Sequence, residues 1–530
     1  MIRSRANGPD DASLLPGRAG AARAEVREVF FPASVGGTLV RSEKTEGTDT
    51  AALRQVAVGA LARTTGSPLA EGNGVRVLQD APENYPAWEE AIGAAQRTVH
   101  IEMYIFRADA SGGRFAALLA ERAAAGVKVR VLCDWFGCWS TPQRLFRQLQ
   151  GCGGEVRYFN PPHPANPIAA LRRNHRKVIC VDGSVAFISG LCIADPWMGD
   201  RTRGIPPWRD TGVELRGPAV ADAEEAFGRS WRESGGSIGD DELPARDTIA
   251  AAGPHGVRVI ASTPETTNLF RVDLLVASLA RHRLWLTDAY FMANVPYMQA
   301  LRHAAADGVD VRLLLPSQSD IRWIGAASRT RYGFLLDAGI RIFEWRGPML
   351  HAKTAVADGL WTRIGSTNLN AGSWMNNWEM DVSIEDASIA RQMETRYETD
   401  LQNADEIVRS GDTVVVARPP QATGPREKGM RRGSMPTGTG SGGQVLRELD
   451  SLGSAVGAAV TGRRSLEIFE FRPLIGFGAI LLLIAAVGFW KPQVVYWPVG
   501  VLLALLGLHL VSRGIQARLH TRRQRSDDSF

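Results

Sequence analysis

The chain has 530 residues, and 45% of them are hydrophobic, so it is large enough to bury more than one core. Its 61 basic and 56 acidic residues nearly balance, which excludes a polybasic chain that coats nucleic acid along its whole length. Its five cysteines form no Cys-x-x-Cys pair, so the sequence predicts neither a disulfide framework nor a zinc site. We expect no cleaved secretory signal, because no apolar segment follows Arg3 and Arg5.

The first part of the chain predicts a short lead-in and then an α/β domain. We expect residues 1–65 to form a mobile lead-in or small cap with one helix around Thr50–Ala62. From Gly74, apolar runs typical of strands alternate with stretches of helical periodicity. The predicted strands are 75–78, Val99–Phe106 and Val127–Cys133, and the predicted helices are Tyr85–Arg97 and Phe115–Ala125. This alternation favours βαβ units and an α/β sheet.

The same order of elements then occurs a second time. The predicted strands are Val257–Ile260, Leu284–Phe291 and Val309–Leu315, and the predicted helices are Val272–Arg281 and Tyr297–Ala306. In the two copies Tyr104 matches Tyr290, and His175 matches His351. We therefore expect two tandem α/β domains, at 66–245 and 246–408, related by a pseudo-twofold axis. Such a pair supplies its own twofold axis, so the site requires no oligomer.

The last part of the chain predicts a membrane anchor. Residues 409–465 have the composition of a linker that is largely disordered. Two apolar runs follow, Leu474–Trp490 and Val494–Val511, each about long enough to cross a bilayer core of roughly 30 Å. Arginines flank their outer ends and aromatic residues mark the turn between them. The positive-inside rule therefore predicts a two-helix transmembrane hairpin at 466–515 with a basic cytoplasmic tail at 516–530. A buried or a re-entrant hairpin is the alternative.

One motif, His-x-Lys-x4-Asp, stands at equivalent points of both copies. The two motifs are His175, Lys177 and Asp182 in the first copy, and His351, Lys353 and Asp358 in the second. Because side chains alternate along a strand, the His and the Lys of each motif point to the same face. Two such strands brought together across the pseudo-twofold axis gather two imidazoles and two ammonium groups in one pocket.

That constellation suits a phosphodiester. Lysines can neutralise the non-bridging oxygens, one histidine can attack phosphorus, and the other can protonate the departing alcohol. The sequence offers no carboxylate cluster to hold a metal, and this chemistry needs neither a metal nor another cofactor.

The sequence resembles the phospholipase D superfamily, and within it the bacterial cardiolipin synthase branch. Besides both motifs, the resemblance includes Trp208-Arg-Asp-Thr-Gly-Val, Gly365-Ser-Thr-Asn-Leu and Asn377-Trp-Glu. It covers about Gly66 to Ile407 and implies transfer of a phosphatidyl group through a phosphohistidine.

The resemblance also implies roles for individual residues. It makes His175 the nucleophile and His351 the acid and base. It assigns the phosphate oxygens to Lys177, Lys353, Ser366 and Asn368. It implies that Asp210 orients His175 and that Glu379 orients His351, with a surface ion pair as the alternative for each carboxylate. Asp182 and Asp358, which complete the motifs, are expected to support the architecture of the site.

The chain departs from the family pattern at two positions. Cys192 stands where such synthases usually have Asn, and a thiol is a much weaker hydrogen-bond donor than an amide. Gly212 stands where the family often has His.

The sequence thus predicts a phosphatidyltransferase of the bacterial cytoplasmic membrane, with its catalytic domains on the cytoplasmic side. Its expected substrates are phospholipids, phosphatidylglycerol first among them. The alternatives are hydrolysis of the same intermediate by water and, in another class, a non-catalytic lipid-binding scaffold. A nuclease is disfavoured, because no basic stripe with interleaved aromatic residues crosses the two domains.

Overall fold

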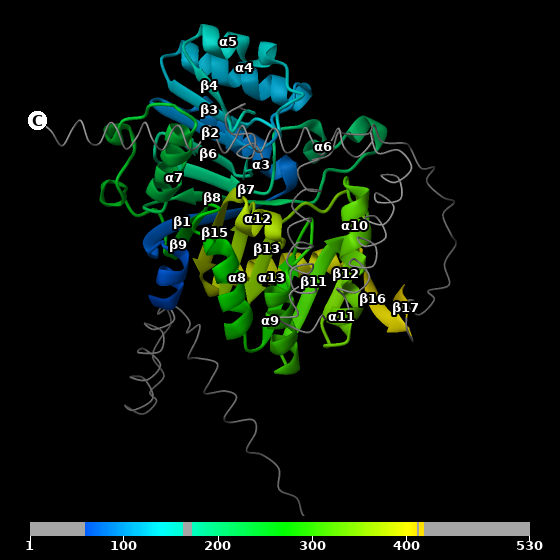
Figure 1. The fold of residues 1–530 in the computed structure, drawn as a ribbon. Coiled ribbons are helices and arrows are strands. Elements are labelled where there is room, and N and C mark those ends of the chain that lie inside the picture. The colour runs from blue at the N-terminus through cyan, green and yellow to red at the C-terminus, as the bar shows by residue number, and fades with distance from the viewer. Residues whose placement is uncertain (1–58, 163–171, 411–412, 418–530) are drawn as a thin grey trace, which may run out of the picture.

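The computed structural model describes residues 59–162, 172–410 and 413–417 (Figure 1). The predicted membrane hairpin at 466–515, the tail at 516–530, most of the predicted linker and most of the lead-in therefore lie outside the described residues. In the part of the chain that the structure describes, no helix has both the length and the apolar composition needed to cross a bilayer.

The first half of the molecule contains a mixed sheet of seven strands. Its spatial order is β1 (Ala70–Gln79), β8 (Thr211–Arg216), β7 (Val185–Ser189), β6 (Lys177–Val181), β2 (Thr98–Met103), β3 (Lys128–Asp134) and β4 (Glu155–Phe159). The strands β2, β3 and β4 are parallel to one another, and every other pair is antiparallel.

The second half repeats this sheet strand for strand. Its order is β9 (His255–Ser262), β15 (Asn377–Glu385), β14 (Trp361–Gly365), β13 (Thr354–Ala357), β10 (Arg283–Thr287), β11 (Asp310–Pro316) and β12 (Arg341–Trp345), with the same relative orientations. β16 (Ala404–Ser410) and β17 (Thr413–Val416) then extend the edge, so strand structure continues past residue 408, where we expected the linker to begin. The short strand β5 (Arg173–Asn174) pairs with β15 across the two halves.

Helices cover the faces of both sheets. Those of the first half are α3 (Asp80–Gly93), α4 (Ala110–Ala124), α5 (Arg147–Gly151), α6 (Asp195–Met198) and α7 (Val220–Glu233). Those of the second half are α8 (Asn268–Leu279), α9 (Val295–Ala306), α10 (Arg322–Arg329), α11 (Tyr332–Leu336), α12 (Ala371–Met375) and α13 (Ala387–Gln402). Asp109 and Asp386 start α4 and α13 by accepting bonds from backbone N–H groups of the first turn, as N-cap residues do.

The two sheets share one apolar core where the halves meet. Val178, Ile188 and Leu215 of the first half pack in one cluster with Val356, Ile364 and Val382 of the second half. In Figure 1 the strands that carry these residues lie at the junction, while α4 and α5 cover the outer side of the first half. The prediction of two repeated α/β domains is therefore confirmed. Both His-x-Lys-x4-Asp motifs lie at this junction, along and next to the strands β6 and β13.

Candidate active site

Each motif histidine is fixed by a backbone bond to the opposite half. The N–H of His175 donates to the carbonyl of Trp378 at 2.9 Å, and the N–H of His351 donates to the carbonyl of Arg209 at 2.7 Å. Trp378 directly precedes Glu379, and Arg209 directly precedes Asp210. The pseudo-twofold repeat therefore brings the carboxylate of each half to the histidine of the other.

The carboxylates are crossed between the halves, which corrects the expected pairing. Glu379 lies 2.9 Å from Nδ1 of His175, and Asp210 lies 2.7 Å from Nδ1 of His351. We had expected Asp210 beside His175 and Glu379 beside His351. The reason is the register at the junction: the start of β15 runs parallel to β5, just before His175, and Arg209 bridges to Leu350, just before His351.

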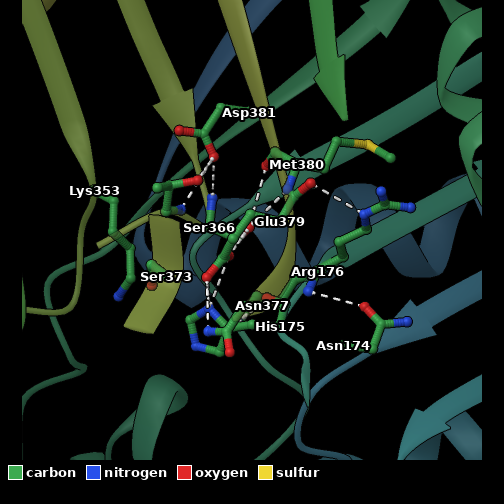
Figure 2. Close-up of polar contacts among 12 residues, drawn as sticks. Asn174, His175, Arg176, Lys353, Ser366, Ser373, Asn377, Glu379, Met380 and Asp381 are labelled. Carbon is green, nitrogen blue, oxygen red and sulfur yellow. Dashed lines mark hydrogen bonds and ion pairs between the residues drawn. The ribbon is translucent and has the colours of Figure 1, made fainter. Parts of the chain in front are cut away.

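Each carboxylate is held by further donors, which differ between the halves. Glu379 accepts bonds from the hydroxyl of Ser366 at 2.6 Å and the amide of Asn377 at 3.0 Å (Figure 2). Asp210 accepts bonds from the indole N–H of Trp197 at 2.9 Å and from the backbone N–H of Thr211 at 2.8 Å. Ser366 was expected to hold phosphate, but its hydroxyl is committed to Glu379.

Burial raises the pKa of Glu379, but attraction to His175, the hydrogen bond between them and the nearby charge of Lys177 outweigh it and lower the pKa to about 2. The same balance, with His351 and Lys353 as the main attracting groups, lowers the pKa of Asp210. Both carboxylates are therefore ionised at neutral pH.

Both histidines are neutral at rest. Burial lowers the pKa of His175 and of His351 from 6.5 to about 4, against the pull of the adjacent carboxylates. With its Nδ1–H donated to a carboxylate, each neutral ring keeps its lone pair on Nε2. A base or nucleophile needs that lone pair, and negative charge arriving in the pocket would favour protonation of one ring.

The two lysines lie buried beside their histidines, with exposed fractions of 2% and 1%. Each ammonium group donates to the carbonyl of its own motif histidine and lies over a tyrosine ring, Tyr104 for Lys177 at 5.0 Å and Tyr290 for Lys353 at 5.6 Å. Burial lowers both pKa values, that of Lys353 to about 8. The lysines keep donors for an anion that enters between the histidines.

Both histidines open into one pocket of about 660 Å³, including its mouth. Its lining residues are Tyr104, Ile105, Arg107, Arg173, His175, Cys192, Trp197, Trp208, Tyr290, Asp320, His351, Asn368, Asn370, Ser373 and Asn377. Asn368 is thus where a phosphate ligand was expected, and its buried carbonyl oxygen has no hydrogen-bond partner in the described part of the chain.

The aspartates of the motifs lie outside this pocket. Asp182 follows the far end of β6 and accepts bonds from the backbone N–H groups of Gln96, Arg97 and Thr98. Asp358 does the same for 281–283 after β13. Both occupy the left-handed region, with φ of 54° and 52°, and each precedes a glycine that does so too. They are turn residues that fasten a neighbouring strand, which agrees with a supporting role and not with a catalytic one.

The two departures from the family pattern have different structural settings. Cys192 is buried in the pocket wall, where burial raises the pKa of its thiol to about 11 and keeps it neutral. Gly212 has no room for a side chain, because a Cβ there would lie 2.1 Å from the amide oxygen of Asn84. Asn84 thus fills the space that a larger residue at 212 would need.

Sequence reasoning missed several residues of the pocket wall. Trp197 and Trp208 pack on His351, with ring centroids 5.2 and 5.8 Å away, and Arg173 lies on the His175 side. Arg173 could have been found, because it precedes His175 by two residues and so shares its face of an extended chain. The short helix α6, which carries Trp197, had no such signal.

The comparisons with known proteins agree with this geometry. A family model described as "Cardiolipin synthase, PLD-like domain" matches residues 89–194 and 276–401, one match in each half. Cardiolipin synthase A of Pseudomonas aeruginosa (strain LESB58) is 36% identical over 350 residues, which are 64% of this chain and 70% of that protein. The chain belongs to the cardiolipin synthase-like branch of the phospholipase D superfamily.

Other relatives extend the comparison. A cardiolipin synthase of Alkalihalophilus pseudofirmus is 31% identical over 346 residues, which cover 64% of this chain and 68% of that protein. The crystal structure of phosphatidylserine synthase from Haemophilus influenzae Rd KW20 superposes with a TM-score of 0.53 at 14% identity, over 66% of this chain and 91% of that one, which shows a shared fold. The cardiolipin synthase-like chain is accordingly a phosphatidyltransferase, as the sequence predicted.

Proposed function

We propose that this pocket joins two molecules of phosphatidylglycerol into cardiolipin and releases glycerol. The observation that carries the proposal is that two neutral histidines, each held by an ionised carboxylate of the opposite half, open into one pocket, and a buried lysine ammonium group lies next to each of them. Both relatives described above are named as cardiolipin synthases, which supports phosphatidylglycerol as the substrate.

In the first step, the imidazole Nε2 of His175 attacks the phosphorus of the donor lipid. A P–N bond forms, the P–O bond to the glycerol headgroup breaks, and His351 gives its proton to the departing oxygen. His351 receives that proton when the anionic lipid enters, since negative charge next to the ring raises its pKa. Lys177 and Lys353 stabilise the charge on the non-bridging oxygens, and Asn368 faces the same space.

In the second step, the hydroxyl of the second lipid replaces the histidine. His351, now neutral, takes the hydroxyl proton, a new P–O bond forms, and the P–N bond to His175 breaks. Glu379 and Asp210 hold the two rings in the required tautomer and stabilise each imidazolium as it forms.

We further propose that the chain works at the bacterial cytoplasmic membrane, with the catalytic domains on the cytoplasmic side. The supporting feature is the pair of apolar runs at 466–515 with arginines at their outer ends. Protease added to intact spheroplasts should leave the catalytic domains uncut. Cleavage of these domains from outside would contradict the proposed topology.

The function is tested with purified full-length protein and liposomes of phosphatidylglycerol, in which cardiolipin and free glycerol are both measured. We expect the two products in equal amounts, and no turnover for His175→Ala or His351→Ala. His303→Ala, an exposed histidine on α9, is the matched control and should keep full activity. Phosphatidic acid without cardiolipin would show a hydrolase instead, and no turnover of any phosphodiester would favour a scaffold.

A further inference from the structure

Arg173 presents a buried positive charge to the active-site pocket. Its exposed fraction is 4%, it lines the pocket, and its guanidinium lies 4.5 Å from the centre of the Phe136 ring. Its Nε and Nη1 atoms are buried and have no hydrogen-bond partner among the residues that the structure describes. A buried guanidinium whose donors are unsatisfied is costly, so this position calls for a ligand.

Two other buried arginines near the site have protein partners for their guanidinium groups, as structural arginines do. Arg176 donates to the carbonyls of Glu379 and Ala226 and to the hydroxyl of Ser230. Arg209 forms an ion pair with Asp400 at 2.8 Å. These side chains are held entirely by the protein.

No ion pair joins Arg173 to a carboxylate in the described ranges. Asp134 is close enough for the charge of Arg173 to lower its pKa against the larger effect of burial, but it lies beyond ion-pair distance, and its two oxygens accept bonds from the backbone N–H groups of Gly137 and Asn174. Residues 163–171, which precede Arg172, include no Asp or Glu. The charge of Arg173 is therefore available to an anion in the pocket.

This charge breaks the pseudo-twofold symmetry of the site. The position two residues before the other motif histidine is Met349, which packs with Tyr290 and Trp208. Trp197 and Trp208 also pack on His351. The residue two positions before the motif histidine is thus a buried cation in the first half and an apolar side chain in the second, so the surroundings of the two histidines differ.

The reacting phosphate does not need Arg173, because Lys177 and Lys353 already lie beside the two histidines. A second anion is present only when the acceptor is itself a phospholipid. Phosphatidylglycerol carries its phosphodiester three glycerol carbons away from the hydroxyl that attacks.

We propose that Arg173 is the subsite for the phosphate of the acceptor phospholipid. This rests on the proposed function and adds to it the basis of acceptor selection. While the donor's phosphatidyl group is bound to the histidine, Arg173 holds the acceptor phosphate through charge-assisted bonds from Nε and Nη1. The acceptor hydroxyl then reaches phosphorus, its proton passes to the other histidine, a P–O bond forms and the P–N bond breaks. The subsite favours an anionic lipid over water or a simple alcohol.

The test is a competition for the covalent intermediate. Phosphatidylglycerol in mixed micelles is given to the full-length protein together with a fixed concentration of ethanol, and cardiolipin, phosphatidylethanol and phosphatidic acid are measured together. The ratio of cardiolipin to the other two products depends only on what happens after the intermediate forms. It is therefore independent of the amount of folded enzyme and of donor binding.

We expect Arg173→Met, which introduces the residue found at the equivalent position of the second half, to lower this ratio by about tenfold or more. Arg173→Lys should give an intermediate ratio, since it keeps the charge without the planar fork. Arg172→Met is the matched control, because Arg172 forms a surface ion pair with Glu265 and does not line the pocket; its ratio should equal that of the unchanged protein.

The outcomes separate the two proposals. If the unchanged protein makes no cardiolipin, the proposed function fails. If it makes cardiolipin and Arg173→Met loses total turnover at an unchanged product ratio, Arg173 serves the donor or the fold, and the acceptor subsite is refuted. If Arg173→Met has no measurable turnover, the ratio for Arg173→Lys decides, and an unchanged ratio there also refutes the subsite.

Discussion

Nδ1 of His351 lies 2.7 Å from an oxygen of Asp210, a residue of the other half of the molecule. The equivalent contact under the pseudo-twofold axis joins Nδ1 of His175 to an oxygen of Glu379. Neither half therefore contains a complete histidine–carboxylate pair, and the apolar junction between the sheets is part of the catalytic apparatus. A shift of one half against the other would separate both pairs at once.

Replacing either carboxylate by its amide should nearly stop turnover without unfolding the protein. In Asp210→Asn the side chain keeps its shape, but it no longer fixes the tautomer of His351 or stabilises its imidazolium. We expect the rate of cardiolipin formation to fall by about 10³-fold or more, and likewise for Glu379→Gln. Asp337→Asn, which alters a surface pair with Arg409, should leave the rate unchanged. A loss below tenfold in Asp210→Asn would contradict the role given to the crossed pairs.

The crossing also predicts which residues act in the same step. A donor lipid with p-nitrophenol as its headgroup needs no acid to depart, so the first step should survive when only the acid is damaged. With this donor, Asp210→Asn and His351→Asn should form and accumulate the phosphohistidine, detected by rapid quenching and mass spectrometry. Glu379→Gln and His175→Asn should not. If the intermediate appeared in His175→Asn, His351 would be the nucleophile.

Cys192 contributes no strong hydrogen-bond donor to the pocket, although it stands where related synthases usually have Asn. The thiol is buried and neutral, and the carbonyl oxygen of Asn368 in the same pocket has no partner in the described residues. Cys192→Asn adds an amide donor that can bond this oxygen or the substrate. We expect kcat for cardiolipin formation to rise by about two- to tenfold relative to Cys192→Ala, a matched control that removes the thiol without adding a donor. Equal kcat values for the two variants would show that a hydrogen-bond donor at position 192 does not speed the reaction.

The motif aspartates should affect stability and not chemistry. Asp182→Ala removes the acceptor of three backbone N–H groups at the start of β2, which we expect to lower the free energy of unfolding by about 2 kcal/mol. Asp358→Ala should cost a similar amount in the second half. Urea unfolding and active-site titration check this. The rate per folded molecule should stay within about twofold of that of the unchanged protein. A much larger loss would show that these aspartates contribute to catalysis.

The sequence predicted the repeat because strands and helices have characteristic local periodicities of apolar residues. The strand predicted at Val127–Cys133 is observed as β3 at Lys128–Asp134, and the helix predicted at Tyr297–Ala306 as α9 at Val295–Ala306. The strand predicted to end at Phe291 ends at Thr287, because the side chain of Asp288 accepts bonds from the backbone N–H of Tyr290 and from that of Leu369 in the loop after β14. Apolar composition alone does not distinguish those residues from a strand.

The pairing of side chains across the two halves was beyond local signals. Asp210 and Glu379 follow their histidines within the same half, so the sequence favoured pairs inside each half. The opposite pairing results from the register of β15 against β5, which depends on how the sheets dock. Ser366 shows the same limit: its residue type suits a phosphate ligand, but only the fold shows that Glu379 occupies its hydroxyl.

The two buried histidines should lower the free energy of unfolding as the pH falls below about 6.5. Their pKa is about 4 in the folded state and 6.5 when exposed, so between these pH values the unfolded chain binds more protons than the folded one. The free energy of unfolding therefore gains up to about 1.4 kcal/mol per pH unit from each histidine as the pH rises through this window, and the gain ends above about pH 7.

Buried carboxyls with raised pKa values, such as Asp288 at about 7, contribute the opposite slope. The contribution of the histidines is therefore obtained by subtracting the curve of a variant that lacks them. Urea unfolding of the unchanged protein and of His175→Asn/His351→Asn from pH 5 to 7.5 provides that difference. The double variant should gain relative stability as the pH falls, and parallel curves would show that the histidines are not held neutral in the folded state.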